Sequence, residues 1–304
     1  MKTIDISVIL PIKSAITPSF DEYLENAINS VVAQRKQVKE LIIVHTEEET
    51  LKNKLSNFDF SGLTVNLVEF KGEPNFCSQV NYGVENCKTE WFSLLEFDDE
   101  YSPIWFDNVE KYAHHFEDVD IFLPLVIDID TKGTFAGFTN EATFAASFAQ
   151  EMGILTNDIL HSYQNFQIAG LVMKKDKFIE QGKLKASMKL TFGYEFFLRM
   201  TYHALKVMTI PKFGYKHLNM REGGIFWNYK NGKDVMSENE VRFWIDMAKK
   251  ERAVVTAEGE IVKFVENALE KVSSLDTFTY INNDVARSFG FTDNKQRLGL
   301  SAQQ

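Results

Sequence analysis

Residues 91–100 read Trp-Phe-Ser-Leu-Leu-Glu-Phe-Asp-Asp-Glu, so an apolar strand runs directly into four carboxylates within five positions. Like charges this close repel one another unless a cation neutralises them. Carboxylate oxygens are hard ligands that suit Mg²⁺ or Mn²⁺, and Mg²⁺ usually binds one or two of them together with substrate phosphates. The alternative is a solvated acidic loop that caps the helix starting near Pro103, because negative charge stabilises a helix N-terminus. Spacing alone leaves both interpretations open.

The chain on either side of this stretch alternates between strand and helix periodicity. Strand-like apolar runs occupy residues 4–10, 41–44, 63–70, 91–97 and 121–126. Apolar residues recur at helical spacing between these runs, and Ser19 and Glu22 form a capping-box pattern before the first helix. This alternation predicts an α/β domain with a mostly parallel central sheet flanked by helices. Ligands of such sheets bind outside the carboxyl ends of the strands, where the acidic stretch lies.

The second half of the chain is less regular. Residues 128–165 lack clear periodicity, and a long loop of this kind is usually functional. After Gly223-Gly224, residues 238–253 and 258–273 read as amphipathic helices rich in Lys and Glu. We therefore expect a main domain over residues 1–224 and a helical C-terminal appendage over 225–304. The apolar faces of those helices would suit a homo-oligomer contact.

Composition excludes several classes of protein. The net charge of −10 disfavours general nucleic-acid binding, because an acidic protein gains nothing from counterion release on a polyanion. Two cysteines cannot form a disulfide framework, which fits a reducing cytoplasm. The N-terminus begins on a strand-like run without a signal-peptide pattern, and no apolar run reaches the roughly 20 residues of a membrane span. We expect a cytoplasmic protein without a membrane span.

Two common nucleotide-binding motifs are absent from the sequence. The turn after the first strand, residues 11–14, contains no glycine, so the dinucleotide-binding pattern G-x-G-x-x-G is missing. The P-loop pattern G-x-x-x-x-G-K-[S/T] is missing as well. A ligand that carries phosphate would therefore be held by a metal or by side chains, and not by a glycine-rich cradle.

An ordered set of short motifs resembles the family 2 glycosyltransferases of the GT-A type. The first strand ends in a Pro-containing turn, and residues 27–34 (Ala-Ile-Asn-Ser-Val-Val-Ala-Gln) match the family's A-I-x-S-V-x-x-Q helix. Residues 40–44 (Glu-Leu-Ile-Ile-Val) open the second strand, and Asn81-Tyr82-Gly83 resembles the N-x-G helix. Residues 96–98 stand where the family has its metal-binding D-x-D motif. The resemblance covers roughly residues 4–224 and is weakest over 128–165.

The resemblance implies roles for particular residues. The implied metal ligands are Glu96, Asp98, Asp99 and His217, and the implied cofactor is Mn²⁺ or Mg²⁺. The implied donor-binding residues are Pro11, Ile12, Lys13, His45, Glu47, Asn81, Phe97 and Arg221. The sequence departs from the family pattern at three places: His45-Thr46-Glu47 replaces the base-binding Asp, Val80 replaces an arginine, and Glu96 replaces the first Asp of the metal motif.

The family also carries an acidic pair at a helix start, one member of which acts as catalytic base. Residues 193–199 (Gly-Tyr-Glu-Phe-Phe-Leu-Arg) resemble that motif with a single acid, Glu195, as the implied base. The alternative for Glu195 is an ion pair with Arg199 at i,i+4 spacing. If Glu195 is only a structural carboxylate, Glu222 and Asp99 are the next candidates for the base.

The expected function is inverting, metal-assisted transfer of a sugar from a nucleoside-diphosphate sugar to an acceptor hydroxyl. Nucleotidyl transfer is a weaker alternative, because it would need a basic glycine-rich loop after the first strand. A non-catalytic GT-A-like scaffold for binding or assembly is the other alternative, favoured by the altered base-binding region and the single acid at Glu195.

Overall fold

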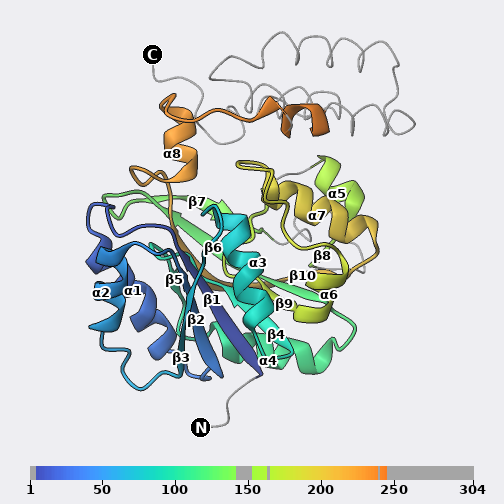
Figure 1. Ribbon diagram of the computed structural model, residues 1–304. Helices are drawn as coiled ribbons and strands as arrows, with labels where there is room; N and C mark the ends of the chain where they lie inside the picture. The colour runs from blue at the N-terminus through green and yellow to red at the C-terminus, as the bar shows by residue number, and fades with distance from the viewer. Residues whose placement is uncertain (1–4, 142–152, 163–164, 239, 245–304) are drawn as a thin grey trace. The chain divides into compact units, whose positions relative to one another are not determined.

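The computed structural model describes residues 5–141, 153–162, 165–238 and 240–244 (Figure 1). The chain divides into two compact units. The first comprises residues 1–156, 165–186 and 192–221, and the second comprises 157–164, 187–191 and 222–304. The separable appendage expected over residues 225–304 stays a prediction, and the helix expected over 258–273 lies outside the described residues.

The first unit is built on a sheet whose N-terminal half is parallel. Its strands β1 (Ile6–Ile12), β2 (Glu40–His45), β3 (Val65–Glu69) and β4 (Trp91–Leu94) lie in the order β3-β2-β1-β4. Every residue of β1 is buried, as expected for a strand covered on both faces. The predicted α/β sheet flanked by helices is therefore confirmed, and the carboxyl ends of these four strands meet at one edge.

Beyond β4 the sheet is mixed, and its order continues as β4-β9-β6-β10-β5. The added strands are β5 (Glu100–Tyr101), β6 (Ile121–Ile129), β7 (Phe135–Thr139), β8 (Ile154–Leu155), β9 (Val172–Lys174) and β10 (Val207–Leu218). The β6 and β10 strands run parallel, whereas β9 runs antiparallel to both β4 and β6. The β7 strand is antiparallel to β6, so part of the segment 128–165 that lacked periodicity extends the sheet.

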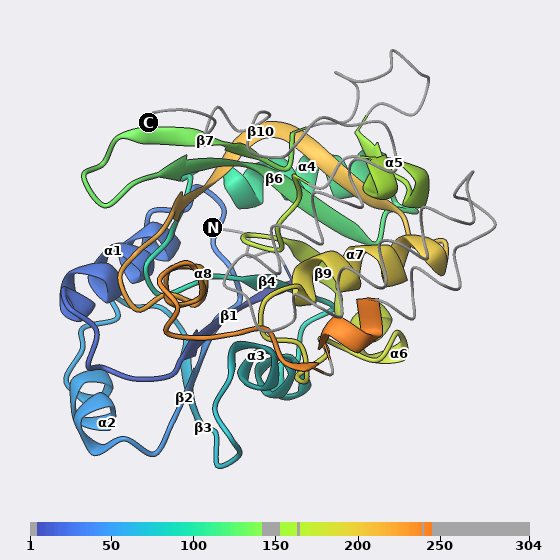
Figure 2. The ribbon, with the colours of Figure 1, turned by 90° about the horizontal axis from the view of Figure 1, so that it is seen from above.

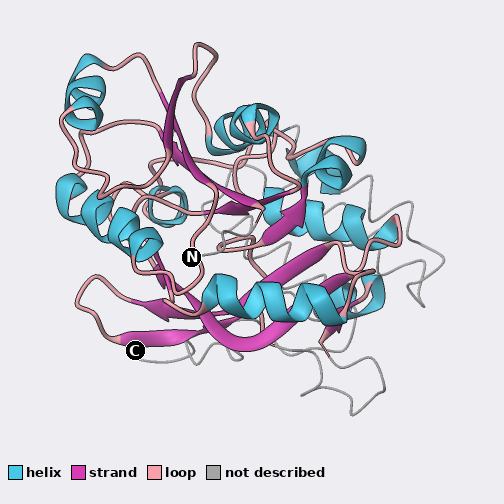
Figure 3. Cartoon of the chain, turned by 90° about the horizontal axis from the view of Figure 1, so that it is seen from below, coloured by secondary structure: helices cyan, strands magenta, loops and turns pink. Residues whose placement is uncertain are grey.

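Helices cover both faces of the parallel strands. The helices of the first unit are α1 (Phe20–Val32), α2 (Glu49–Ser56), α3 (Phe76–Asn86), α4 (Trp105–His115), α6 (Lys175–Glu180) and α7 (Phe192–Tyr202). Figure 2 shows α1 and α2 on one side of β1–β3 and α3 on the other, and Figure 3 shows the strands running between the helices. The second unit contains α5 (Asn157–Ser162) and α8 (Ile225–Lys230).

A glycine sets the close packing of α3 on the sheet. A Cβ atom on Gly83 would lie 2.5 Å from Cγ2 of Ile9 and 2.8 Å from Cγ2 of Val44, closer than two carbon atoms can pack. The glycine of Asn81-Tyr82-Gly83 is therefore required by the contact of α3 with β1 and β2. This contact fixes α3 beside the carboxyl ends of those strands.

Two local expectations are corrected. Ser19 lies in the left-handed region (φ 58°) and makes no side-chain hydrogen bond to α1, so the predicted capping box does not form. By their sequence, residues 206–210 and 213–217 are expected to form two short strands. They belong to one strand, β10, whose register against β6 shifts between Ile210 and Tyr215. Among the described residues, no helix is both long enough and apolar enough to cross a membrane.

Candidate active site

The acidic stretch lies in the turn between β4 and β5, at the carboxyl edge of the sheet. The short strand β5 pairs antiparallel with β10, with Tyr101 opposite Tyr215 and Glu100 opposite Lys216. This pairing folds the turn of residues 95–99 back against the end of β10. Residues about 120 positions apart in the sequence thereby come into contact.

Asp99 is the buried centre of this contact, with an exposed fraction of 1%. Its Oδ1 accepts a hydrogen bond from the backbone N–H of Leu218 (2.8 Å), and its Oδ2 lies 3.0 Å from Nδ1 of His217. Burial alone would lower the pKa of His217, but the charge and hydrogen bond of Asp99, together with the charges of Glu96 and Asp128, outweigh this effect and raise the pKa to about 10. Asp99 thus holds both the backbone and the side chain at the end of β10.

Asp98 faces a different cation. Its Oδ2 accepts a hydrogen bond from Nε of Arg221, and the Arg221 guanidinium carbon lies 4.8 Å from the ring centroid of Phe97. Burial and the nearby charge of Asp99 raise the pKa of Asp98, and Arg221 opposes this rise. Three residues with implied roles in donor or metal binding are therefore in mutual contact.

Glu96 completes a set of groups that fits a divalent cation. Ligand atoms of Glu96, Asp99 and His217 all lie within 4.8 Å of one another. Burial, followed by repulsion from Asp99, raises the pKa of Glu96 to about 8. The two carboxylates suit Mn²⁺ or Mg²⁺, and the imidazole nitrogen favours a transition metal over Mg²⁺. Asp98, the fourth implied metal ligand and the last residue of the position that matches the D-x-D motif, is bonded to Arg221 beside this set.

Asp128 is a further acid of this neighbourhood and was not among the predicted site residues. It lies on β6 in register with His217 on β10, and burial raises its pKa to about 6. The expected strand stopped at Val126, which assigned Asp128 to a loop. The observed strand continues to Ile129, and the signal available in the sequence was the alternation of Ile and Asp over residues 127–130.

The residues expected to bind the nucleotide lie at the carboxyl ends of β1 and β2. Pro11 and Ile12 end β1, and Lys13 follows them. The carbonyl of Lys13 accepts a hydrogen bond from Oγ1 of Thr46 (2.9 Å), which ties the loop after β1 to the loop after β2. His45 is buried, whereas Glu47 is exposed.

Gln79 of α3 connects the ends of β1 and β2, and it was also not among the predicted site residues. It is 1% exposed, and its Nε2 donates to the carbonyls of Ile12 (2.9 Å) and Val44 (3.1 Å). Asn81, two residues further along the helix, makes both of its amide hydrogen bonds to the backbone of Leu184. The structure therefore uses the Asn81 side chain to hold a neighbouring loop.

Glu195 lies in the first turn of α7 and is engaged in a buried ion pair. Its Oε1 and Oε2 accept hydrogen bonds from Nε (2.7 Å) and Nη2 (2.9 Å) of Arg199, and Glu195 is 4% exposed. Arg199 also donates to the carbonyls of Gln181 and Lys183. The described interactions of Glu195 do not join it to the acidic cluster, and its role as base stays a prediction.

Residues 7–169, more than half of the chain, match the sequence model of glycosyl transferase family 2. The chain belongs to this family. The match includes β1, the α3 glycine and the acidic turn after β4. The family predicted from the ordered motifs is therefore confirmed.

A curated relative supports the same family. An uncharacterised glycosyltransferase of Rickettsia typhi is 30% identical over 118 residues, which are 37% of this chain and 35% of the relative. The match thus spans about a third of the relative's length.

Solved structures share the fold. The S. aureus protein TarS (residues 1–349) in complex with UDP-GlcNAc superimposes with a TM-score of 0.60 at 14% identity, over 99% of this chain and 76% of that one. TarS 1–349 without that ligand gives a TM-score of 0.56 at 12% identity, over 97% of this chain and 92% of that one.

Proposed function

We propose that this family 2 glycosyltransferase moves a sugar from a nucleoside-diphosphate sugar to an acceptor hydroxyl, with inversion and with help from a divalent cation. The observation that carries the proposal is the set of ligand atoms from Glu96, Asp99 and His217 within 4.8 Å of one another, at the carboxyl edge of the sheet. The TarS complex with UDP-GlcNAc supports a nucleotide-sugar as donor.

The acidic cluster would hold the cation against the diphosphate. Glu96, Asp99 and His217 supply oxygen and nitrogen ligands, and Asp98 adds negative charge beside them. A bound Mn²⁺ or Mg²⁺ would neutralise the charge that develops on the leaving diphosphate. Arg221 is bonded to Asp98, and its positive charge would favour an anion that enters the cluster. Arg221 is thus a cationic group beside the metal ligands, and His217 would have to lose its proton to bind the cation.

The transfer is a single displacement at the anomeric carbon. The acceptor oxygen forms the new bond on the face opposite the diphosphate, the carbon–oxygen bond to the diphosphate breaks, and the diphosphate leaves with the electron pair. A base accepts the proton of the acceptor hydroxyl. Glu195 is our candidate for the base, and in this role it has to release at least one of its two hydrogen bonds to Arg199.

The buried pair of Glu195 and Arg199 also favours a second candidate function. If Arg199 keeps both carboxylate oxygens, the start of α7 supplies no base, and the protein would be a nucleotide-binding scaffold without transfer activity. The cation cluster would be retained in both cases, so nucleotide binding alone does not separate the two functions. Transfer or slow hydrolysis of the donor does.

Calorimetric titration of UDP in EDTA and again in Mn²⁺ tests the role of the metal. We expect binding about tenfold tighter or more in Mn²⁺, because the cation links the carboxylates to the diphosphate. The matched control is Glu100→Gln, which removes a neighbouring carboxylate that pairs with Lys216 outside the ligand set. Equal affinity for UDP in both buffers would remove the cation from the proposal.

A further inference from the structure

A second polar network adjoins the acidic cluster and has no part in the mechanism above. It contains Asp128 at the end of β6, Thr139 at the end of β7, and the nearby Asn140 and Gln167. Asp128 is in register with His217 on one side and with Gly137 of β7 on the other, so the network begins where the candidate cation site ends. Asp128 is 6% exposed and Asn140 is fully buried.

Hydrogen bonds through Gln167 connect the members of this network. Its Nε2 donates to Oγ1 of Thr139 and, at 3.4 Å, to Oδ1 of Asp128. Its backbone N–H donates to Oδ1 of Asn140 at 2.8 Å. Thr139 and Gln167 are half-buried, so they form the accessible side of the network, and Asp128 and Asn140 form its base.

One polar atom of the network has no hydrogen-bond partner. Nδ2 of Asn140 is buried without a hydrogen-bond partner, although buried polar groups in folded proteins are nearly always paired. Asn140 also has a φ of 58°, in the left-handed region where residues other than glycine are uncommon. The hydrogen bond that Asp128 receives from Gln167 is long. A strong donor for Asp128 and an acceptor for Asn140 are both lacking among these bonds.

We propose that Asp128, Asn140 and Gln167 form a subsite for a hydroxyl group of a neutral sugar. A hydroxyl donates one hydrogen bond and accepts others, so it can donate to the Asp128 carboxylate and accept from an amide nitrogen. A phosphate or carboxylate would be repelled by the charge of Asp128 and by that of Asp99. The identity of this group as a sugar rests on the proposed function. The sugar belongs either to the donor or to the acceptor.

The experiment compares the full-length wild-type chain with Asp128→Asn and Gln167→Ala. Gln167 is half-buried, so its replacement tests the subsite even if Asp128→Asn does not fold. Asp107→Asn is the matched control, because Asp107 is a surface residue of α4 paired with Lys111. Calorimetry in Mn²⁺ measures the affinity for UDP, UDP-GlcNAc, UDP-glucose and UDP-galactose. A glycan array measures the binding of neutral oligosaccharides to the same proteins.

If the subsite binds the donor sugar, the wild type binds one UDP-sugar more tightly than UDP. We expect both variants to bind that UDP-sugar about tenfold more weakly than the wild type, while their affinity for UDP stays unchanged. If the subsite binds the acceptor, both variants lose glycan binding and keep the affinity for every nucleotide. Either result supports the subsite, and Asp107→Asn should match the wild type throughout.

The proposal is overturned if both variants bind all nucleotides and glycans as the wild type does. It is also overturned if the variants lose affinity for UDP and for UDP-sugars by the same factor, because that pattern places the residues in the cation site. If the wild type binds no nucleotide, the proposed function is refuted instead. Binding of neutral oligosaccharides on the glycan array then still tests the subsite. If no glycan binds in that case either, both proposals fail.

Discussion

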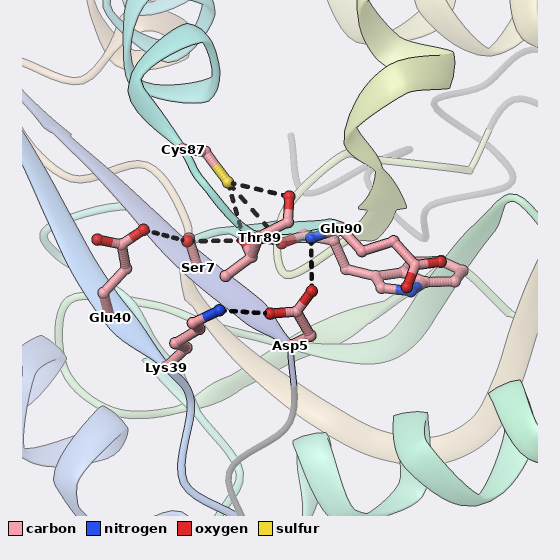
Figure 4. A network of polar contacts seen from close by, with 8 residues as sticks. Asp5, Ser7, Lys39, Glu40, Cys87, Thr89 and Glu90 are labelled. Carbon is pink, nitrogen blue, oxygen red and sulfur yellow. Dashed lines mark hydrogen bonds and ion pairs between the residues drawn. The ribbon is translucent and has the colours of Figure 1, made fainter.

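Polar side chains gather at both ends of the central sheet, and the two groups differ in how the fold treats charge. At the amino ends of β1, β2 and β4 lies a network of short hydrogen bonds between hydroxyls and a half-buried carboxylate (Figure 4). Ser7 donates to Oε1 of Glu40 (2.7 Å) and lies 2.7 Å from Oγ1 of Thr89, which itself donates to the carbonyl of Trp91 (2.6 Å). The buried hydroxyls of Ser7 and Thr89 are both paired.

At the carboxyl ends the same sheet buries several acids of like charge. A backbone hydrogen bond from Glu90, supported by Lys39, lowers the pKa of Asp5 at the amino ends. Burial raises the pKa values of Glu96, Asp98 and Asp128 at the carboxyl ends. The native structure therefore favours the ionised carboxylate of Asp5 at the amino ends of the strands and disfavours ionisation of the acids at the carboxyl ends. Acids whose ionised form is disfavoured by the fold mark candidate functional sites, since a bound cation or ligand can compensate their negative charge.

The largest expected effect concerns Glu195, which tests whether the candidate catalytic machinery extends beyond the carboxyl-end cluster. If Glu195 is the base, Glu195→Gln should lower turnover by about 10²- to 10⁴-fold while donor affinity stays near that of the wild type. The measurement is steady-state transfer, or slow donor hydrolysis with water as acceptor, beside calorimetry of the donor.

Arg199→Lys is the matched control for this change. It keeps the positive charge but loses the two-pronged contact with Glu195. If Arg199→Lys lowers turnover as much as Glu195→Gln, the Glu195 carboxylate acts through the ion pair and is not the base. Normal turnover of Glu195→Gln would direct the search to Glu222 or Asp99.

The next effect tests the acidic cluster itself. Asp98→Asn should weaken donor binding in Mn²⁺ by about tenfold or more, together with turnover, because the site loses a charge beside the cation. The free energy of unfolding should change little, because the raised pKa shows that the fold already disfavours the charge of Asp98. A large loss of stability with normal donor affinity would make Asp98 a structural partner of Arg221.

A third prediction follows from the direction of the pKa shifts. Glu96 keeps its proton in the folded chain up to a pH of about 8, whereas the unfolded chain loses it near 4.5, so stability falls as the pH rises through this window. The raised pKa values of Asp128, about 6, and of His217, about 10, act in the same direction over neighbouring windows. Wild-type stability should therefore decline from about pH 4.5 to 8 in EDTA.

Glu96→Gln should remove part of that decline. Each unit of pKa shift corresponds to about 1.4 kcal/mol, and since Glu96 is only half-buried we expect the variant to recover about 1–3 kcal/mol at pH 8. Denaturant unfolding at pH 4.5 and pH 8 gives the two free energies. Glu100→Gln serves as the control, and identical pH slopes for the wild type and Glu96→Gln would contradict the prediction.

The smallest effect belongs to the amino-end network and should be confined to stability. Thr89→Val removes the hydroxyl that contacts Ser7, Cys87 and the carbonyl of Trp91, at a cost of about 1–2 kcal/mol in the free energy of unfolding. Its affinity for UDP in Mn²⁺ should equal that of the wild type. A clear loss of UDP affinity at unchanged stability would contradict the prediction that the amino-end network affects stability and not nucleotide binding.

The sequence by itself determined the α/β alternation, the family and the position of the acidic turn. Strand and helix periods are local properties, and Glu96, Asp98 and Asp99 are close because they are neighbours in the chain. The glycine at position 83 could be read in the same way, since the Asn-Tyr-Gly motif is local, although its physical reason is the contact of α3 with β1 and β2.

Only the tertiary structure decided which groups meet the acids. The pairing of β5 with β10 places His217 against Asp99 and Arg221 near Asp98, and the parallel pairing of β6 with β10 sets Asp128 beside His217. These contacts join residues that are about 90 to 120 positions apart in the chain, and a shift of one residue in β10 would turn His217 to the other face of the sheet. Strand register and burial are properties of the folded chain, and they determine both the pKa values and the ligand set.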